Sequence, residues 1–288
     1  MNKVFPLCFV LLWSSAFISS KIIVGEATPF ASLAFRFGFV SLGFALYSFY
    51  QNYKFTSSFK NIFEAAGTGI LFHGFCLGGS FFALSKGFPA GIVALIVSLQ
   101  PILTTILARP LLGEKITRKQ WLGIFLGFSG TIIVLGFDFS ESLQIIGIMS
   151  TIIALLASTA GTLWQKKLSG KLPLPINSMY QALSACFFHI LVMYFFEISF
   201  INFSSNFIFA MSWQVFIISF AAFTIFMYLI KTGSASGTSS LFFLVPPVSA
   251  IMAWLFLDEN LFFMDIVGLL IATIGVYIST RTYNNTVK

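Results

Sequence analysis

Long apolar runs separated by short polar connections follow one another along almost the whole chain. A membrane-spanning helix needs about 20 mostly apolar residues, and ten runs approach or exceed that length. They cover residues 4–24, 30–50, 62–85, 89–109, 121–137, 143–165, 177–197, 212–232, 237–257 and 265–281. Because the connections are short, consecutive helices should be antiparallel neighbours. The pattern therefore predicts an all-α membrane protein with ten transmembrane helices, the first of them uncleaved.

The composition agrees with this pattern. Hydrophobic residues make up 58% of the chain and charged residues 9%, whereas soluble domains carry about 25% charged residues. Too few charges are present to cover a surface that faces water. We therefore expect one membrane domain without an appended soluble domain, with the lipid bilayer as its surroundings.

The positive charges indicate orientation rather than a nucleic-acid partner. The net charge is +7. With the N-terminus in the cytoplasm, only Lys21 and Lys86 fall on the outer side and Arg36 lies within a helix. All other basic residues then fall on the inner side, as the positive-inside rule requires. The sequence thus predicts a multi-pass protein of the bacterial inner membrane with both termini in the cytoplasm, and no nucleic-acid binding.

No pattern in the sequence indicates a cofactor or a metal. Cys8, Cys76 and Cys186 lie inside apolar runs, where cysteine behaves as a small core residue. The spacings CxxC, HExxH and GxxxxGK[ST] are absent, which argues against metal binding and against direct use of ATP. We expect no cofactor and no metal.

The two halves of the sequence align when one is shifted by 145 residues, without gaps. The aligned pairs include Lys21 with Lys166, Lys86 with Lys231, Pro101 with Pro246, Glu114 with Glu259, Gly123 with Gly268, and Gly130 with Gly275. Each half holds five predicted helices, so the second half enters the membrane from the opposite side. We therefore predict two inverted repeats, residues 1–142 and 143–288, an arrangement found in secondary transporters. A duplicated scaffold that transports nothing is the alternative.

Several short motifs recur in a characteristic order. They are Trp13-Ser14-Ser15-Ala16-Phe17, Arg36-Phe37, Pro101-Ile102-Leu103, Gly113-Glu114, Gln120-Trp121-Leu122-Gly123, Leu244-Val245-Pro246-Pro247-Val248 and Asp258-Glu259. Over essentially its whole length the chain resembles the EamA family of the drug/metabolite transporter superfamily, although that family usually has Gly-Glu where Asp258-Glu259 stands. The resemblance implies ten helices, an inward-facing N-terminus and transport of small solutes. It does not name the cargo.

Polar and aromatic residues predicted to lie near mid-membrane are candidate substrate contacts. His73 belongs to a stripe of small or polar residues (Ala66, Gly69, His73, Cys76, Ser80) that should face a cavity, and Gln100 offers an amide next to Pro101. Trp13, Ser14, Phe17, Trp164 and Tyr180 could line the pathway. For each, a structural role in packing, in a helix contact or in an aromatic belt is the alternative.

Prolines and lysines are candidate moving parts. Pro101, Pro246 and Pro247 each remove an intrahelical hydrogen bond, so they are candidate hinges or static kinks. Lys21 and Lys166, related by the shift, could serve as outer and inner gates or simply extend towards the lipid headgroups.

Other residues are interpreted as structural. Arg36 and its equivalent Gln181 should make polar contacts between helices, and Glu114 and Glu259 should cap helices, with proton coupling as the alternative. Gly123 and Gly268 should allow close helix packing, within one chain or in a homodimer. His189 should form a structural hydrogen bond.

These observations together predict a secondary transporter of a small organic metabolite, with amino acids and related compounds as candidates. The cargo would bind among the first, third, fourth, sixth, eighth and ninth helices. A non-transporting scaffold or receptor, and a membrane-embedded lipid-modifying enzyme, are the competing hypotheses. The transport direction and the coupling ion are not indicated.

Overall fold

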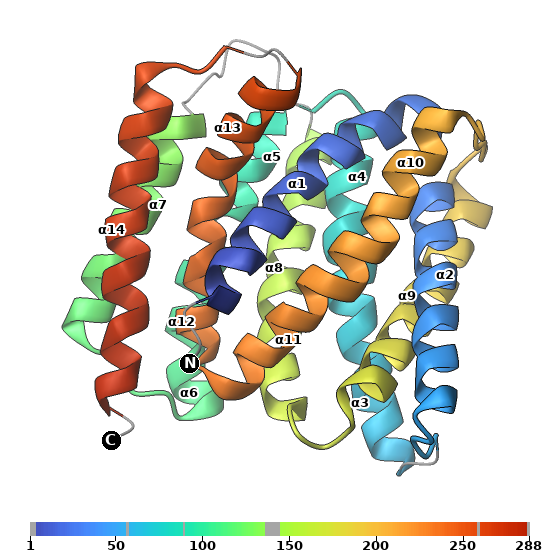
Figure 1. Ribbon diagram of the computed structural model, residues 1–288, viewed down its shortest axis with the longest axis horizontal. Coiled ribbons are helices and arrows are strands. Elements are labelled where there is room, and N and C mark those ends of the chain that lie inside the picture. The colour runs from blue at the N-terminus through green and yellow to red at the C-terminus, as the bar shows by residue number, and fades with distance from the viewer. Residues whose placement is uncertain (1–3, 56–57, 89, 136–144, 258–259, 287–288) are drawn as a thin grey trace.

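The computed structural model of the protein describes residues 4–55, 58–88, 90–135, 145–257 and 260–286, and these residues form a bundle of helices (Figure 1). The first half contributes α1 (Val4–Glu26), α2 (Pro29–Tyr50), α3 (Phe59–Gly69), η1 (Ile70–Leu77), α4 (Gly78–Ser85), α5 (Ala90–Val97), α6 (Gln100–Leu112) and α7 (Arg118–Leu135). The second half contributes α8 (Ile145–Leu168), α9 (Leu174–Phe196), α10 (Ser205–Trp213), η2 (Gln214–Ala222), α11 (Phe223–Thr232), α12 (Ala235–Ser239), η3 (Ser240–Leu244), α13 (Val245–Leu257) and α14 (Phe263–Thr286). The prediction of an all-helical membrane protein is confirmed.

Nine helical stretches among the described residues are long and apolar enough to cross a membrane. They are α1, α2, α3 with η1 and α4, α5 with α6, α8, α9, α10 with η2 and α11, α12 with η3 and α13, and α14. Each coincides with one predicted apolar run. The remaining run, 121–137, corresponds to α7, which has 18 residues and begins with Arg118 and Lys119. The protein is therefore a multi-pass membrane protein.

Four of the long helices change geometry near their middle. η1 and η2 are π-helical segments, the helix is interrupted between Val97 and Gln100, and η3 is a 3-10 segment directly before Val245. Pro101 and Pro246 stand at the start of α6 and α13, directly after these interruptions. Proline suits a first helical turn because the first N–H groups of a helix have no partner there. Irregular backbone at membrane depth is tolerated where protein or a cavity surrounds it.

Two helix pairs form opposite flanks of the bundle: α7 with α14 on the left of Figure 1, and α2 with α9 on the right. The α7–α14 contact is backbone to backbone. A Cβ atom at Gly123 would lie 2.6 Å from the Gly275 carbonyl, and one at Gly130 would lie 2.5 Å from the Gly268 carbonyl. Gly123 and Gly268 thus lie in a helix contact within one chain.

The two ends of the bundle differ in charge. At the lower end of Figure 1, α2, α6, α8 and α11 end and α3, α7, α9 and α12 begin. Ten basic residues of the described ranges lie there, and we call this the basic end: Lys54, Lys60, Arg109, Lys115, Arg118, Lys119, Lys166, Lys167, Lys171 and Lys231. The basic end also holds Glu64 and Glu114, whereas the opposite end carries Lys21, Lys86 and the acidic residues Glu26, Glu197 and Asp265.

Candidate functional site: a central cavity lined by both halves

A cavity of about 250 Å³ lies in the middle of the bundle, among the interrupted helices. Its walls come from α1, α2, η1, α4, α5 and α6 in the first half, and from α8, α9, η2, α11, η3 and α13 in the second half. The lining reaches Leu84 and Val93, close to the ends of α4 and α5 that face away from the basic end. Most of these helices were predicted to surround the cargo, but α2 and α9 were not.

Aromatic rings form much of the cavity wall. The Trp13 ring lies 5.4 Å from the Phe242 ring and 6.4 Å from the Phe72 ring, measured between centroids, and both contacts are edge-on. Phe17 lies one helical turn further along α1 and also lines the cavity. Edge-to-face packing of this kind stabilises the rings in fixed positions, so this wall is a preformed apolar surface.

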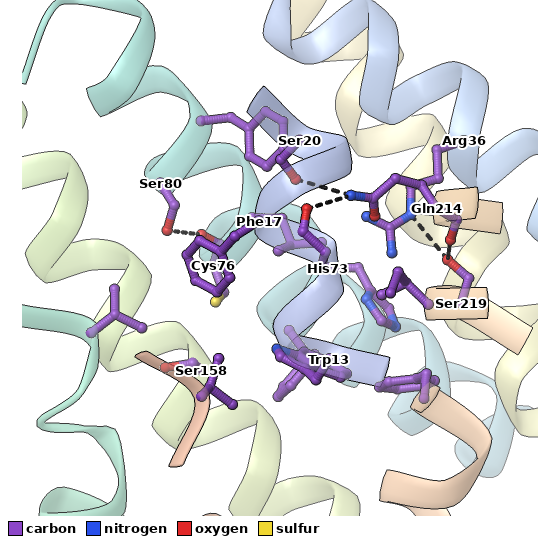
Figure 2. A pocket seen from close by; sticks show the side chains of 18 of the residues that line it. Trp13, Phe17, Ser20, Arg36, His73, Cys76, Ser80, Ser158, Gln214 and Ser219 are labelled. Carbon is purple, nitrogen blue, oxygen red and sulfur yellow. Dashed lines mark hydrogen bonds between the residues drawn. The ribbon is translucent and has the colours of Figure 1, made fainter. Parts of the chain in front are cut away.

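A polar cluster borders the cavity between α1, α2 and η2 (Figure 2). Arg36 donates a hydrogen bond from Nε to the Ser219 hydroxyl at 3.0 Å, and Ser219 donates to the Gln214 carbonyl at 3.0 Å. The Gln214 amide nitrogen lies within 3.0 Å of the Ala16 carbonyl and of the hydroxyls of Ser19 and Ser20, three acceptors that share its two hydrogens. These bonds hold α1 and α2 against the π-helical segment η2.

His73 lies beside this cluster, on η1 (Figure 2). Its ring is packed between Phe37, at a centroid distance of 4.8 Å, and Phe223, at 4.5 Å. Within the described part of the chain, no hydrogen bond reaches its ring nitrogens, which border the cavity. The His73 carbonyl accepts a hydrogen bond from His189 Nε2 at 3.1 Å, which is a structural bond of the kind predicted for His189.

Only part of the predicted stripe around His73 faces the cavity. Cys76 and Ser80 line it, but Gly69 faces α9, where an added Cβ atom would lie 2.3 Å from the Gln181 carbonyl. The physical reason is η1: its π-helical turns hold more residues than α-helical turns. Residues before and after this segment therefore no longer share one face. The stripe as predicted is wrong at Gly69 and at Ala66, whose carbonyl accepts a hydrogen bond from Ser184 of α9.

Gln100 begins α6 at the helix interruption and lines the cavity. Its amide nitrogen donates to the hydroxyls of Thr104 and Thr162, both at 3.1 Å, so it joins α6 to α8. Its carbonyl oxygen is buried and has no hydrogen-bond partner among the described residues. Ile218 and Val245, which the 145-residue shift aligns with His73 and Gln100, also line the cavity. In these two pairs the polar residue belongs to the first half and its apolar equivalent to the second.

Three predicted substrate contacts lie away from the lining. Ser14 is fully buried and donates to the Val245 carbonyl at 3.3 Å, because the turn of α1 that points Trp13 and Phe17 at the cavity directs Ser14 towards α13. Trp164 packs against Gly67 of α3. The Tyr180 hydroxyl donates to the Phe55 carbonyl at 2.9 Å, which lies at the basic end.

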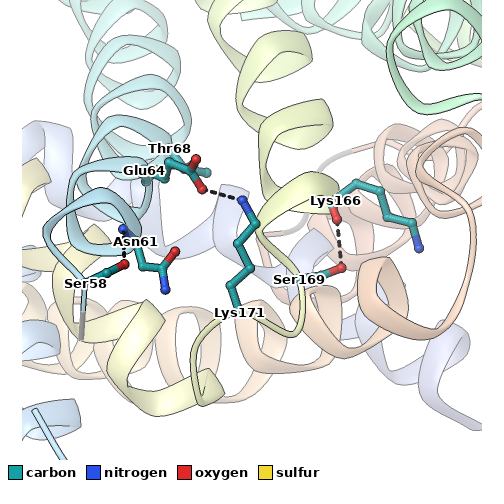
Figure 3. Close-up of polar contacts among 7 residues, drawn as sticks. All are labelled: Ser58, Asn61, Glu64, Thr68, Lys166, Ser169 and Lys171. Atoms are coloured by element: carbon teal, nitrogen blue, oxygen red, sulfur yellow. Dashed lines mark hydrogen bonds and ion pairs between the residues drawn. The ribbon is translucent and has the colours of Figure 1, made fainter. Parts of the chain in front are cut away.

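Several polar bonds join helices at the basic end, some within the second half and one between the two halves. Lys166 donates from Nζ to the carbonyls of Ile230 and Gly233, where α11 ends. Lys171 and Glu64 form an ion pair at 2.7 Å, and Figure 3 shows the Lys166 amino group pointing away from it. Lys21, the predicted counterpart of Lys166, lies near the C-terminal end of α1, away from the basic end. Gln181 joins α9 to α8 through Gln165 at 2.6 Å.

Glu114 is the most extensively bonded of these residues. Its carboxylate accepts hydrogen bonds from the Ala235 amide at 2.6 Å, the Ser236 amide at 3.3 Å and the Ser236 hydroxyl at 2.7 Å. Gly113 ends α6 with a φ of 70°, a left-handed conformation that glycine adopts readily, and this turn brings Glu114 to α12. Glu114 thus caps a helix of the other half. Glu259, its equivalent in the repeat, lies outside the described residues.

Sequence reasoning missed the polar cluster. Gln214 and Ser219 were not singled out, and Arg36 was interpreted as a contact between helices only. A glutamine within the apolar run 212–232 was the available signal for Gln214. Nothing in the local sequence pairs Ser219 with Arg36, because 183 residues separate them.

Comparisons with known proteins agree with a transporter. The model of the EamA-like transporter family matches twice, over residues 4–136 and 145–281. The chain is 27% identical over 199 residues to the uncharacterized transporter YvbV of Bacillus subtilis. The aligned region covers 65% of this chain and 62% of that protein. It is 24% identical over 297 residues to a probable amino-acid metabolite efflux pump of Escherichia coli, covering 96% and 94% of the two chains.

The fold has a counterpart among solved structures. One crystal structure superimposes with a TM-score of 0.84 at 17% identity, covering 98% of this chain and 97% of the other. A similarity at this level of identity concerns the fold alone. The family match, in contrast, extends over nearly the whole sequence, in two consecutive copies. The chain therefore belongs to the EamA-like transporter family.

Proposed function

We propose that the protein is a ten-helix secondary transporter whose two inverted halves, residues 1–142 and 143–288, alternately open the central cavity to the two sides of the membrane. Its cargo is a small organic metabolite, with amino acids and related compounds as the first class to test. It acts in the bacterial inner membrane with both termini in the cytoplasm.

Three observations support ten helices and two inverted halves. α7 packs lengthwise against α14, which favours α7 as a tenth span. The family model matches each half separately. The interruptions also recur at equivalent positions: a shift of 145 residues moves η1 onto residues 215–222 within η2, and moves the start of α6 at Gln100 onto the start of α13 at Val245. Five spans in each half would give the halves opposite orientations.

The charge difference between the two ends supports the orientation. Cytoplasmic loops carry an excess of lysine and arginine, which assigns the basic end to the cytoplasm. The Glu114 bonds, which join the two halves, then hold the cytoplasmic side closed, and the Lys166 bonds to the end of α11 lie at the same side. The cavity lining at Leu84 and Val93 approaches the outer side. In this interpretation the structure is an inner-closed state.

The single observation that carries the proposal is a cavity at mid-depth with walls from both halves. Repeat-based transporters bind cargo at the repeat interface near the bilayer midplane. Pockets for drug-sized ligands are about 300–1,000 Å³, so a cavity of about 250 Å³ suits a smaller metabolite. The efflux-pump name of the Escherichia coli relative favours amino-acid metabolites as cargo and export as direction.

Roles for individual residues follow from this proposal. His73 and Gln100 contact the polar part of the cargo, and Trp13 and Phe17 contact its apolar part. Pro101, Pro246 and Pro247 border the interruptions at which the helices bend. Lys166 and Glu114 belong to the inner gate.

Uptake into proteoliposomes tests the proposal. Radiolabelled amino acids and related metabolites are tested with and without a pH gradient, using the wild type, His73→Ala and Phe75→Ala. Phe75 lies two residues from His73 but is exposed at the helix surface, so it serves as the matched control. We expect saturable uptake of at least one compound that His73→Ala loses and Phe75→Ala retains. Absence of uptake above empty liposomes for every compound, with folded protein, would contradict the proposal.

A further inference from the structure

We infer that the cargo is an organic anion with an apolar body, and that Arg36 binds its carboxylate. This inference rests on the proposed function and narrows its substrate class from small organic metabolites to organic anions, which excludes zwitterionic amino acids. It comes from the charge balance around the cavity, in which a buried arginine has no anionic partner among the described residues.

The bonds of Arg36 leave most of its guanidinium unused. A guanidinium has five N–H donors. Arg36 uses the Nε donor, on Ser219, and its Cζ atom lies 5.3 Å from the centre of the Phe37 ring. The four N–H groups on its two terminal nitrogens have no acceptor within the described part of the chain. The side chain is 93% buried and lines the cavity.

The surroundings of Arg36 do not neutralise its charge. A serine hydroxyl and a phenyl face offer partial charges only. Burying a charge without a partner is costly, and an arginine at membrane depth normally pairs with another group or faces a water-filled space. Here the free side of the guanidinium faces the cavity, so a bound ligand can supply the missing anion.

Every described carboxylate is bonded elsewhere, and none lines the cavity. Glu64 pairs with Lys171, and Glu114 caps α12. Glu26 accepts from Asn202, Glu197 accepts from the amides of Phe30 and Ala31, and Asp265 accepts from the amide of Phe262. The described lining therefore carries a positive charge without a negative one. This favours an anion over a zwitterion, because the ammonium group of a zwitterion would find no carboxylate here.

The position of Arg36 also suits a carboxylate geometrically. Ser219 holds the Nε side, so the terminal nitrogens are oriented as a fork, and such a fork can bind a carboxylate through two parallel hydrogen bonds. Phe37 lies between Arg36 and His73, with its ring near both. Beyond them stands the aromatic wall of Trp13 and Phe72, which can accept the apolar body of the ligand (Figure 2).

A congeneric series tests the inference by calorimetric binding to the full-length protein in lipid nanodiscs. The probes are 3-phenylpropionate (an anion), phenylalanine (a zwitterion), 3-phenylpropanamide (neutral) and inorganic phosphate. We expect 3-phenylpropionate to bind at least tenfold more tightly than the other three. Arg36→Gln should weaken its binding about 10- to 100-fold, as loss of a charge-assisted bond predicts, and should leave binding of the amide unchanged. Arg36→Lys should restore part of the loss.

The matched control is Lys86→Gln, which removes a cation outside the cavity and should leave all affinities unchanged. Tighter binding of phenylalanine than of 3-phenylpropionate, or equal affinity in the wild type and Arg36→Gln, would overturn the inference while leaving the proposed transport function intact. If inorganic phosphate bound as tightly as 3-phenylpropionate, the inference that the cargo is an organic anion with an apolar body would be overturned. Lack of binding by every probe would also overturn the inference, and the proteoliposome panel would then decide the proposed function separately.

Discussion

Replacing Glu114 by glutamine should open the basic end of the cavity. Glu114 lies in the connection after α6, and its carboxylate accepts three hydrogen bonds from the first two residues of α12. Glutamine has almost the same size, but it lacks the charge and has a single acceptor oxygen. Its NH₂ group would face donors where the second carboxylate oxygen now accepts.

The size of the effect follows from these bonds. A hydrogen bond to a charged group contributes about 1.5–3 kcal/mol, and the substitution removes at least one such contribution. A value of about 2 kcal/mol corresponds to about a 30-fold change in an equilibrium constant. Because the bonds join the two halves at the closed end, the inner-closed state loses this stabilisation. The population with an open basic end should rise about 30-fold.

Cys76 provides the reporter, because it lines the cavity at mid-depth. Cys8→Ser and Cys186→Ser remove the other two cysteines. A membrane-impermeant thiol reagent is then applied to inside-out and right-side-out vesicles, and the rate of Cys76 modification is measured. We expect Glu114→Gln to raise the rate about 30-fold from the cytoplasmic side and to lower it from the outer side.

Glu64→Gln is the matched control. It also removes a carboxylate at the basic end, but the partner Lys171 is 40% exposed, and exposed ion pairs contribute about 0–1 kcal/mol. Its modification rates should change by no more than a few-fold. The reasoning would be refuted by equal cytoplasmic rates in Glu114→Gln and the unsubstituted reporter, with both proteins folded.

Three further substitutions test other parts of the account. Gly275→Ala should lower the thermal unfolding temperature, because its Cβ atom would lie 2.3 Å from the Gly127 amide nitrogen and such overpacking costs about 1–3 kcal/mol. Gly25→Ala is the control, because a Cβ atom there would have no neighbour within 4 Å, and it should not lower the unfolding temperature. An equal decrease in both variants would contradict the α7–α14 contact. Gln214→Leu should lower the unfolding temperature, because it removes the amide that bonds to three acceptors on α1. Phe216→Leu, at an exposed position, should not lower it, and an unchanged temperature for Gln214→Leu would argue against the polar cluster. Trp13→Ala should weaken the binding of 3-phenylpropionate, measured by calorimetry, about threefold to tenfold, because this corresponds to the energy of one aromatic contact. Unchanged affinity would show that the aromatic wall is not part of the binding site.

The membrane helices were predictable because lipid imposes a strong requirement. Every span must be apolar over a fixed length, so the runs at 30–50 and 177–197 lie within three residues of the ends of α2 and α9. Pro101 and Pro246 lie directly after the interruptions of their helices. The π-helical segments η1 and η2 contain no proline. Their residues are as apolar as those of a regular helix, so their effect on the stripe at Gly69 was not foreseeable.

The site was predictable only where a single residue carried its own signal. His73, Gln100, Trp13 and Phe17 stand out as polar or aromatic groups at mid-membrane, and all four line the cavity. Arg36 was predicted only to make a polar contact between helices, and its bond to Ser219 is such a contact; its place in the cavity lining was not predicted. Its true direction depends on Ser219 of the other half, a contact between distant residues that only the fold creates.

The measurement that tests the central claim most directly is transport through a blocked cavity. A cargo found in the proteoliposome panel is assayed before and after a bulky thiol reagent modifies Cys76, in the variant that retains only this cysteine, with its Cys76→Ser counterpart as the control. If the cavity is the transport pathway, modification abolishes saturable flux, excess cargo protects Cys76 from the reagent, and the Cys76→Ser protein is unaffected. Full transport by protein whose Cys76 is completely modified would contradict the account.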